Sequence, residues 1–134
     1  MSSHPINNHR AFDDAVLQHW ELLGKELRQD VEDFNRDQGG LASFTEAGST
    51  EYRVSSPEFG LEVRITADTE SHIVSYEFLR MNDNSAGAPE GGILSIRLGA
   101  DGVEFFSADR PVTSSEARSL LLEPVLNPPG SKAA

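Results

Sequence analysis

Four histidines are the side chains of this sequence best suited to metal binding or proton transfer. His4 and His9 lie in a polar N-terminal stretch, and His9 stands four residues before Asp13. That spacing can place two metal ligands on one side of a helix, but a competent site needs a third and a fourth ligand. The sequence fixes neither, so we interpret the pair as a solvated contact near a helix start, and we predict no metal or other cofactor.

The other two histidines have different surroundings. His19 stands beside Trp20 at the border of an apolar stripe, which is typical of a partly buried histidine with a hydrogen-bond partner. His72 follows Asp68 and Glu70 and opens a predicted strand. We interpret it as a turn contact rather than as a pH-dependent switch.

The stretch Asn82–Gly87 resembles the start of an EF-hand calcium loop, with Gly87 at the sixth position. The twelfth position would then be Ile93, where an EF-hand needs a bidentate glutamate. The sequence therefore does not predict an EF-hand, and a weak surface cation site remains the alternative.

Carboxylates are abundant, but their pattern does not indicate catalysis. Asp13–Asp14 and Glu32–Asp33 lie on what we expect to be the wet face of a helix, whereas acid–base catalysis needs carboxylates whose burial separates their pKa values. The sequence also lacks the common nucleophile, phosphate-loop, dinucleotide and zinc-protease motifs. We therefore predict that the protein is not an enzyme.

The length, charge and cysteine content of the chain limit the kinds of protein and partner that fit the sequence. The chain has 134 residues and a net charge of −11, which disfavours nucleic acids and anionic membranes as partners. It has no cysteine, which excludes disulfides and thiolate chemistry. We expect a flexible N-terminus over 1–8, a single domain over 9–126 and a flexible tail over 127–134. The polar start has no apolar run typical of a secretory signal, so we expect a cytoplasmic location.

The segment from His9 to Asp37 predicts one long amphipathic helix. Its apolar residues recur every three or four positions, which keeps them on one face of a helix. They are Phe12, Val16, Trp20, Leu23, Leu27, Val31 and Phe34. Gly24 interrupts the helix and indicates a close packing contact, and Gly39–Gly40 predicts its end.

After residue 40 the apolar period changes to two, which is typical of strands with one buried face. We expect strands over 41–46, 51–55, 59–66, 72–80, 93–98 and 103–107, joined by turns too short for parallel crossovers. Thr113 and Glu116 form a capping box for a short helix that we expect to end at Pro124. The sequence thus predicts an α+β fold, in which a long N-terminal helix packs across a curled antiparallel meander of five or six strands, followed by a short C-terminal helix.

The outward positions of the predicted sheet are mostly charged, but four of them are apolar. These candidate interface residues are Ile73, Leu79, Ile93 and Phe106. An apolar group on a wet face usually lies under a helix or at an interface with a partner. If the short helix docks elsewhere, we expect a second subunit to cover these residues.

Two functions from different classes follow from these patterns. The first is a non-enzymatic protein-interaction module, a homodimer or the partner of another protein. The second is a small-molecule binding domain with an apolar pocket between the long helix and the sheet, near Trp20, Tyr76 and Phe105. In size, charge and element order the chain resembles the type III secretion chaperones, although it has the loop Met81–Gly92 where that family has a helix; the resemblance implies dimeric, protein-binding behaviour.

Overall fold

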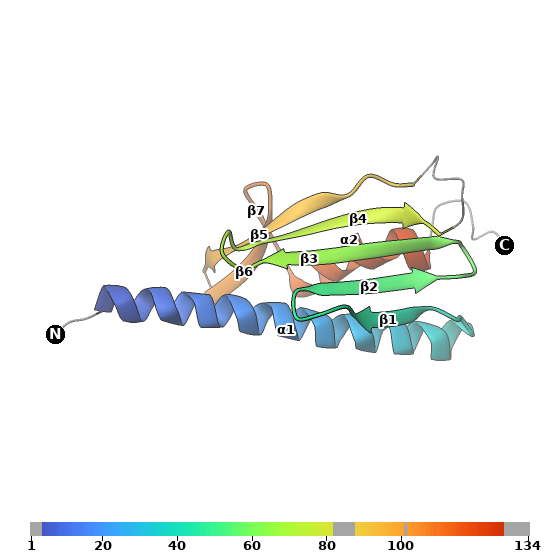
Figure 1. Cartoon of the computed structure of the whole chain (residues 1–134), viewed down its shortest axis with the longest axis horizontal. Helices are drawn as coiled ribbons and strands as arrows, with labels where there is room; N and C mark the ends of the chain where they lie inside the picture. The colour runs from blue at the N-terminus through green and yellow to red at the C-terminus, as the bar shows by residue number, and fades with distance from the viewer. Residues whose placement is uncertain (1–3, 82–87, 101, 128–134) are drawn as a thin grey trace.

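The computed structural model describes residues 4–81, 88–100 and 102–127, with side chains from residue 11 onward. This part of the chain forms two helices and seven strands in the order α1, β1 to β7, α2 (Figure 1). The predicted α+β class is therefore confirmed, and the sheet has one strand more than the predicted maximum. The predicted tail over 127–134 lies outside the described residues except for Asn127, as do residues 1–3 of the predicted flexible N-terminus.

Helix α1 spans His4–Gln38 and begins earlier than the predicted His9. The predicted apolar stripe forms its packed face. Val16, Trp20, Leu23, Leu27 and Val31 are buried, and Phe12 and Phe34 are half-buried at the two ends. Burying each large apolar side chain contributes roughly 1.5–3 kcal/mol, so the stripe, rather than helix propensity, holds α1 in place.

The C-terminal end of α1 is covered by the segment that follows it. Gly39 adopts a φ of 67°, the left-handed conformation predicted for the residue that stops the helix. The Asn35 amide then donates to the Ala42 carbonyl at 2.8 Å and accepts from the Ala42 N–H at 3.0 Å. Gly40 passes so close to the Phe34 ring that a Cβ there would overlap it. These contacts shield the Phe34 end of the stripe.

The seven strands form one antiparallel sheet whose order follows the sequence. Its strands are β1 (Ser43–Glu46), β2 (Glu51–Ser56), β3 (Leu61–Asp68), β4 (Ile73–Arg80), β5 (Gly92–Gly99), β6 (Gly102–Ser107) and β7 (Arg110–Val112). We did not predict β7 because it has three residues and contains Pro111. Proline is tolerated here because β7 is an edge strand, where its missing N–H leaves no ladder bond unmade.

Five of the six predicted strand starts differ from the observed ones by one or two residues, and at two of them the cause is a turn. Phe59 lies in the turn between β2 and β3, where its N–H donates to the Ser56 carbonyl at 3.2 Å. His72 belongs to the turn before β4 and adopts a left-handed φ of 57°. In both cases turn geometry overrides the alternation of apolar residues, which by itself does not locate the first paired residue.

Helix α2 spans Ser114–Leu126 and continues past Pro124, where we predicted its end. The predicted capping box is present, with the Thr113 hydroxyl accepting from the Glu116 N–H at 3.0 Å and Glu116 Oε1 accepting from the Thr113 N–H at 2.8 Å. Pro124 lies in the last turn, where the Asn127 N–H still reaches the Glu123 carbonyl at 2.8 Å. The proline therefore removes one hydrogen bond without ending the helix.

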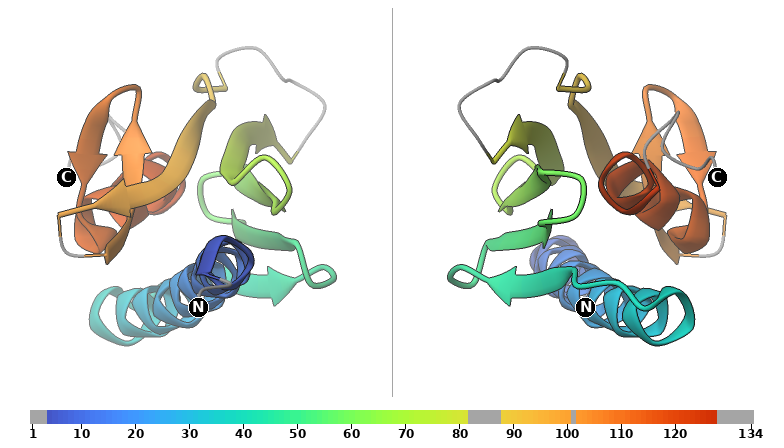
Figure 2. Two further views of the ribbon diagram at one scale, coloured as in Figure 1. Left: turned by 90° about the vertical axis from the view of Figure 1, so that its left-hand side faces the viewer. Right: turned by 90° about the vertical axis from the view of Figure 1, so that its right-hand side faces the viewer.

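The sheet curls around α2, and α1 covers the open side that remains (Figure 2). Helix α2 packs against β2 and β3 on one arm of the curl and against β6 and β7 on the other, whereas α1 packs mainly against β1, β6 and α2. Ala117, Leu121 and Val125 of α2 are completely buried as a result. The interior of the curled sheet is thus filled by α2, and α1 closes the gap between its arms.

The N-terminal turns of α1 extend beyond the ends of the strands (Figure 1). A helix of 35 residues is about 52 Å long, whereas the longest strands, with eight residues each, span about 27 Å. The end of α1 that projects is therefore its N-terminal end (Figure 1).

Candidate interaction surface

Helix α2 leaves the outer face of the sheet uncovered. Helix α2 lies inside the curl of the sheet (Figure 2). Ile73, Ile93 and Phe106 each stand next to a buried residue of the same strand, so they point outward and α2 does not dock on them. The register places Ile73 opposite Ser95 and Ser95 opposite Phe106, and Ile93 lies opposite Ser75 on the adjacent row. These three residues therefore form one group across β4, β5 and β6.

Leu79, the fourth candidate interface residue, lies apart from this group. It is on β4 six residues after Ile73, which corresponds to about 20 Å along the strand. Its neighbour across the ladder is Glu62. The prediction of a single group of four is wrong in this respect. Every second residue of a strand points to the same face of the sheet, but such residues can lie far apart along the strand.

At one corner of the sheet, the end of β5 lies next to α1 and to this apolar group. Because β4 begins opposite Ser95, the last residues of β5 continue beyond it without a β4 partner. The corner holds a shallow cleft of about 430 Å³, lined by Phe12, Ser71, His72, Ile73, Ser95, Ile96, Arg97 and Leu98. We call Phe12, Ile73, Ile93, Leu98 and Phe106 together the end surface.

Leu98 is the most exposed member of the end surface. We expected it to point into the core with Leu94 and Ile96, which are buried, yet Leu98 is 69% exposed. Its side chain lies beyond the part of the sheet that the two helices cover. Ile93 is 57% exposed, and the other three members are half-buried.

His72 joins α1 to the corner. Its Nε2 lies 3.1 Å from Asp13 Oδ1, and the Phe12 ring meets its imidazole edge-on with centroids 4.7 Å apart. The His72 carbonyl accepts from the Ile96 N–H at 2.9 Å. His72 thus lies in the turn rather than at the start of a strand, and its side-chain partner is Asp13 on α1 rather than an acidic residue of the turn. The carboxylate of Asp68 instead accepts from the N–H groups of Glu70 and Ser71 within the turn.

Arg97 provides the positive charge of this region. Its guanidinium lies 4.8 Å from the centre of the Phe106 ring, and its Nη2 donates to the Ala108 carbonyl at 2.8 Å. Its nearest carboxylate is the exposed Asp109, at 3.5 Å. A stacked guanidinium covers one face of an aromatic ring while keeping donors free for a partner.

Trp20, Tyr76 and Phe105, the predicted pocket residues, do not line a common pocket in the described part of the chain. Trp20 is buried against Tyr52, with ring centroids 4.1 Å apart, and its indole N–H donates to the Ser49 carbonyl at 2.9 Å. Tyr76 packs edge-on against Phe78. Of the three predicted residues, Phe105 borders a cavity next to α1, and His19 also lines this cavity.

The remaining sequence candidates for metal binding lie mostly outside the part of the chain that the structure describes. Within residues 11–81, 88–100 and 102–127, no three His, Asp or Glu side chains gather in a way that could hold a metal ion. The side chains of His4 and His9 and the stretch Asn82–Gly87 lie outside the described residues.

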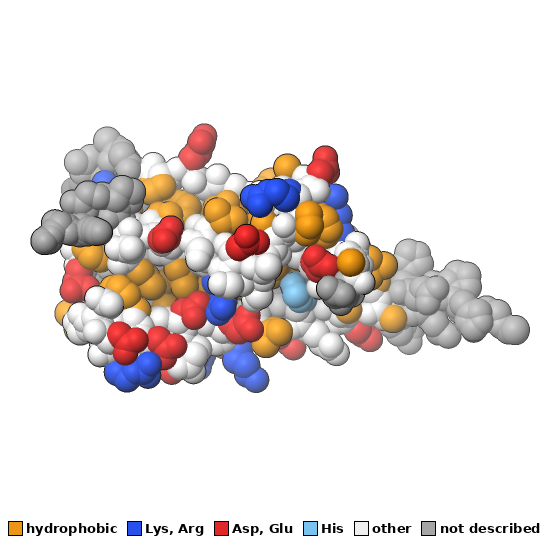
Figure 3. All heavy atoms as spheres, turned by 180° about the vertical axis from the view of Figure 1, so that it is seen from behind, with side chains coloured by type: hydrophobic (Ala, Val, Ile, Leu, Met, Phe, Trp, Pro, Cys, Tyr) orange, Lys and Arg blue, Asp and Glu red, His pale blue; other side chains and the backbone are white. Residues whose placement is uncertain are grey.

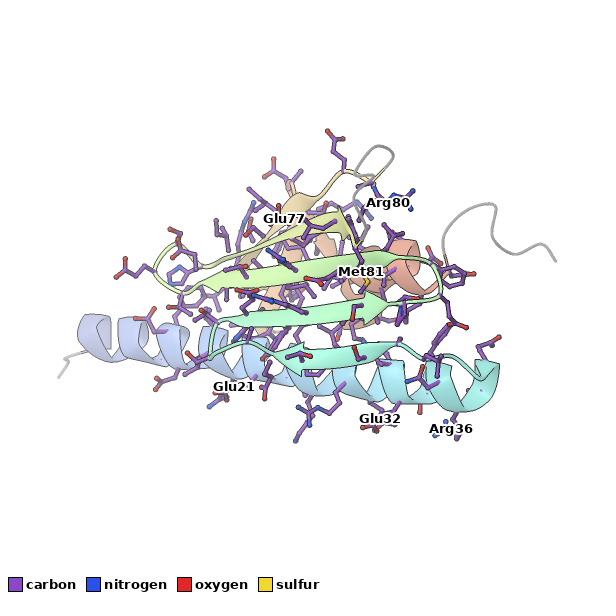
Figure 4. All side chains as sticks on the ribbon, turned by 45° about the vertical axis from the view of Figure 1, so that its right-hand side comes forward. Glu21, Glu32, Arg36, Glu77, Arg80 and Met81 are labelled. Atoms are coloured by element: carbon purple, nitrogen blue, oxygen red, sulfur yellow. The ribbon has the colours of Figure 1, made fainter. Side chains whose placement is uncertain are left out.

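The carboxylates of α1 divide between its outer face and its contact with α2. Glu21, Glu32 and Arg36 point away from the sheet (Figure 4). Glu26 and Asp30 instead face Arg118 of α2, whose Nη1 lies 3.2 Å from Asp30 Oδ2. Burial raises the pKa of Asp30, and the nearby Arg118 opposes this effect. On the side of α2, β6 and β7, hydrophobic side chains gather between such charged groups (Figure 3).

Comparisons with protein-family models, with characterised proteins and with solved structures found no match to this chain. In the part of the chain that the structure describes, none of the helices is long and apolar enough to span a membrane.

Sequence reasoning missed Phe12, His72 and Leu98 as members of one site. Alternation assigned Leu98 to the core, and helical periodicity assigned Phe12 to the packed stripe. These residues come together because β4 and β5 are offset along the sheet. The offset depends on the register of two strands that a long loop separates, so no local pattern in the sequence indicates it.

Proposed function

We propose that this protein is a small acidic interaction module of the cytoplasm, without catalytic activity of its own, that works as a homodimer through the end surface. The observation that carries the proposal is the position of α2. Because α2 fills the inside of the sheet, Phe12, Ile73 and Leu98 line an open cleft at the corner where α1 projects. Ile93 and Phe106 lie near this cleft on the outer face of the sheet. Apolar side chains gathered at a surface in this way support an interaction site.

The charges around the end surface favour a second copy as its occupant. Arg97 and His72 lie within the cleft, and Asp13 and Asp14 lie on the adjoining side of α1. In a two-fold dimer the same patch of both copies meets, so the acidic border of one copy lies near the arginine of the other. The net charge of −11 disfavours nucleic acids and anionic membranes as occupants.

Sedimentation equilibrium at micromolar concentrations tests the proposal. We expect the wild type to be a dimer and Leu98→Glu and Ile73→Glu to be monomers. Leu41→Glu is the matched control, because Leu41 is also 69% exposed but follows α1 at the opposite end of the molecule. A monomeric wild type would overturn the homodimer.

The salt dependence separates a second copy from a basic partner protein. Two copies with a charge of −11 each repel one another, so screening by added salt strengthens their association. A basic partner would bind more weakly as the salt concentration rises. Self-association that weakens with salt would show that pairs between Arg97 and the acidic border of the second copy outweigh the repulsion of the net charges. A wild type that stays monomeric at every salt concentration would overturn the second copy as the occupant.

A further inference from the structure

A cavity of about 470 Å³ lies between α1, β6 and the start of α2. It is lined by His19, Val103, Glu104, Phe105, Pro111, Val112, Thr113 and Ser114. Its volume falls within the range of small-molecule sites in proteins, roughly 300–1,000 Å³. The cavity shares no residue with the end surface.

One part of the lining is apolar. Phe105 and Val112 are buried, and Val103 is half-buried beside them. Pro111 belongs to the edge strand β7 and has no N–H to offer. These walls suit the hydrocarbon or aromatic body of a ligand better than a strongly hydrated one.

His19 is the polar group available to a ligand. Its ring packs against Phe105 with centroids 4.5 Å apart and is half-buried, and within the described part of the chain no group hydrogen-bonds to its nitrogens. Burial lowers the pKa of His19, while the charges of Glu26 and Glu104 raise it by less. Burial thus favours the neutral imidazole, in which one nitrogen is a hydrogen-bond acceptor.

The other polar groups of the cavity are engaged or negatively charged. The Thr113 hydroxyl caps α2, and the Ser114 hydroxyl donates to Glu26 Oε1 at 2.6 Å. Glu104 borders the cavity from β6, but it lies opposite Arg97 on the outer face of the sheet, with its carboxylate beside Gly99. None of the described residues that line the cavity is a lysine or an arginine. The charges of Glu26 and Glu104 act on His19 from outside the apolar part of the lining, and this negative field favours a cation over an anion.

We propose that this cavity binds a small organic cation, in which an apolar body packs on Phe105 and Val112 and a protonated amine donates a hydrogen bond to His19. The negative charges of Glu26 and Glu104, which act on His19, also attract the ammonium group. A carboxylate ligand of the same shape would meet the charges of Glu26 and Glu104 and is expected to be rejected.

Titration with two probes of opposite charge tests this proposal. 2-Phenylethylamine and 3-phenylpropanoate have the same ring and chain length and differ in their charged group. At pH 7.5 we expect the amine to shift the ring proton resonances of His19 saturably, with a dissociation constant of roughly 1 mM for so small a ligand, and the acid to leave them unchanged. Equal shifts from both probes, or none from the amine, would overturn the proposal.

Two further measurements assign the effect to His19. His19→Leu, which removes the acceptor, is expected to weaken amine binding at least tenfold. His72→Leu, at the half-buried histidine next to the end surface, is expected to leave amine binding unchanged. Independently of any variant, protonating His19 removes its acceptor and adds a repelling charge, so the affinity of the wild type for the amine must fall as His19 is titrated in acid. Unchanged affinity in His19→Leu, or in the wild type once the His19 resonances show that the ring is protonated, would refute the site.

Discussion

The ring of Tyr52 lies nearly parallel to the indole of Trp20, with centroids 4.1 Å apart, and occupies the space beside Gly24. Its hydroxyl reaches over the helix and donates to the Trp20 carbonyl at 3.1 Å. A Cβ on Gly24 would overlap this ring. The glycine in the middle of α1 is thus explained by a side chain from β2, which fixes how closely the helix approaches the sheet.

Gly24→Ala is therefore expected to destabilise the protein by about 1–3 kcal/mol through overpacking. At an open helical position the same change would stabilise by about 1 kcal/mol. Urea unfolding measures the difference. In a Tyr52→Leu background the overlap is removed, and Gly24→Ala should become neutral or stabilising; a stabilising effect in the wild type would contradict the contact.

Tyr52 also predicts a loss of stability in alkali. Burial, with smaller effects from the charges of Glu46 and Glu21, raises its pKa from 10.0 to about 12. Since the folded protein holds this proton more tightly than the unfolded chain, the contribution is complete below pH 10 and is lost as the pH rises from 10 to 12. Burial also raises the pKa of Tyr76, the second tyrosine of the chain.

Urea unfolding at a series of alkaline pH values checks this expectation. Tyr52→Phe should flatten the fall in the free energy of unfolding, and adding Tyr76→Phe should flatten it further. An equally steep fall in the double variant would assign the pH dependence to other groups.

The contact between α1 and α2 depends on Arg118. Its guanidinium faces Asp30 at 3.2 Å and Glu26 at 3.9 Å, and only 22% of its side chain is exposed. Arg118→Ala leaves two partly buried carboxylates next to one another, so we expect a loss of about 1–3 kcal/mol at pH 7. This loss of stability should become smaller at acidic pH. Burial raises the pKa of Asp30, so this carboxylate takes up a proton as the pH falls and no longer needs a positively charged partner.

Arg36 provides the control for this prediction. It also pairs with an aspartate, Asp33, at 2.9 Å, but 66% of its side chain is exposed. Because solvent screens this exposed pair, Arg36→Ala is expected to leave the free energy of unfolding close to that of the wild type. Equal effects of the two arginine substitutions in urea unfolding would show that burial of the Arg118 contact adds nothing.

The capping box of α2 gives the last prediction. Thr113→Ala removes the acceptor of the Glu116 N–H and should destabilise the protein by about 0.5–2 kcal/mol. Ser115→Ala, at an exposed position in the first turn of α2, should be close to neutral. Thermal unfolding followed by circular dichroism compares the two variants, and a Thr113→Ala protein as stable as the control would contradict the role of the cap.

The sequence determined the local elements of this protein. The spacing of Val16, Trp20 and Leu27 predicted the buried face of α1, and Thr113 with Glu116 predicted the start of α2. These patterns are readable because helical and extended backbones repeat every 3.6 and two residues, so side chains a few positions apart share a face whatever lies around them. Short or proline-containing elements such as β7 carry too few repeats to be recognised.

Only the tertiary structure decided where these elements meet. The curl of the sheet places α2 inside it and α1 on its open side, and this arrangement leaves Ile73 uncovered and separates it from Leu79. The offset of β4 against β5 exposes Leu98, and the crossing of α1 brings Asp13 to His72 and His19 to Phe105. Such contacts depend on strand twist, curl and register accumulated over many residues, which the alternation within a single strand does not encode.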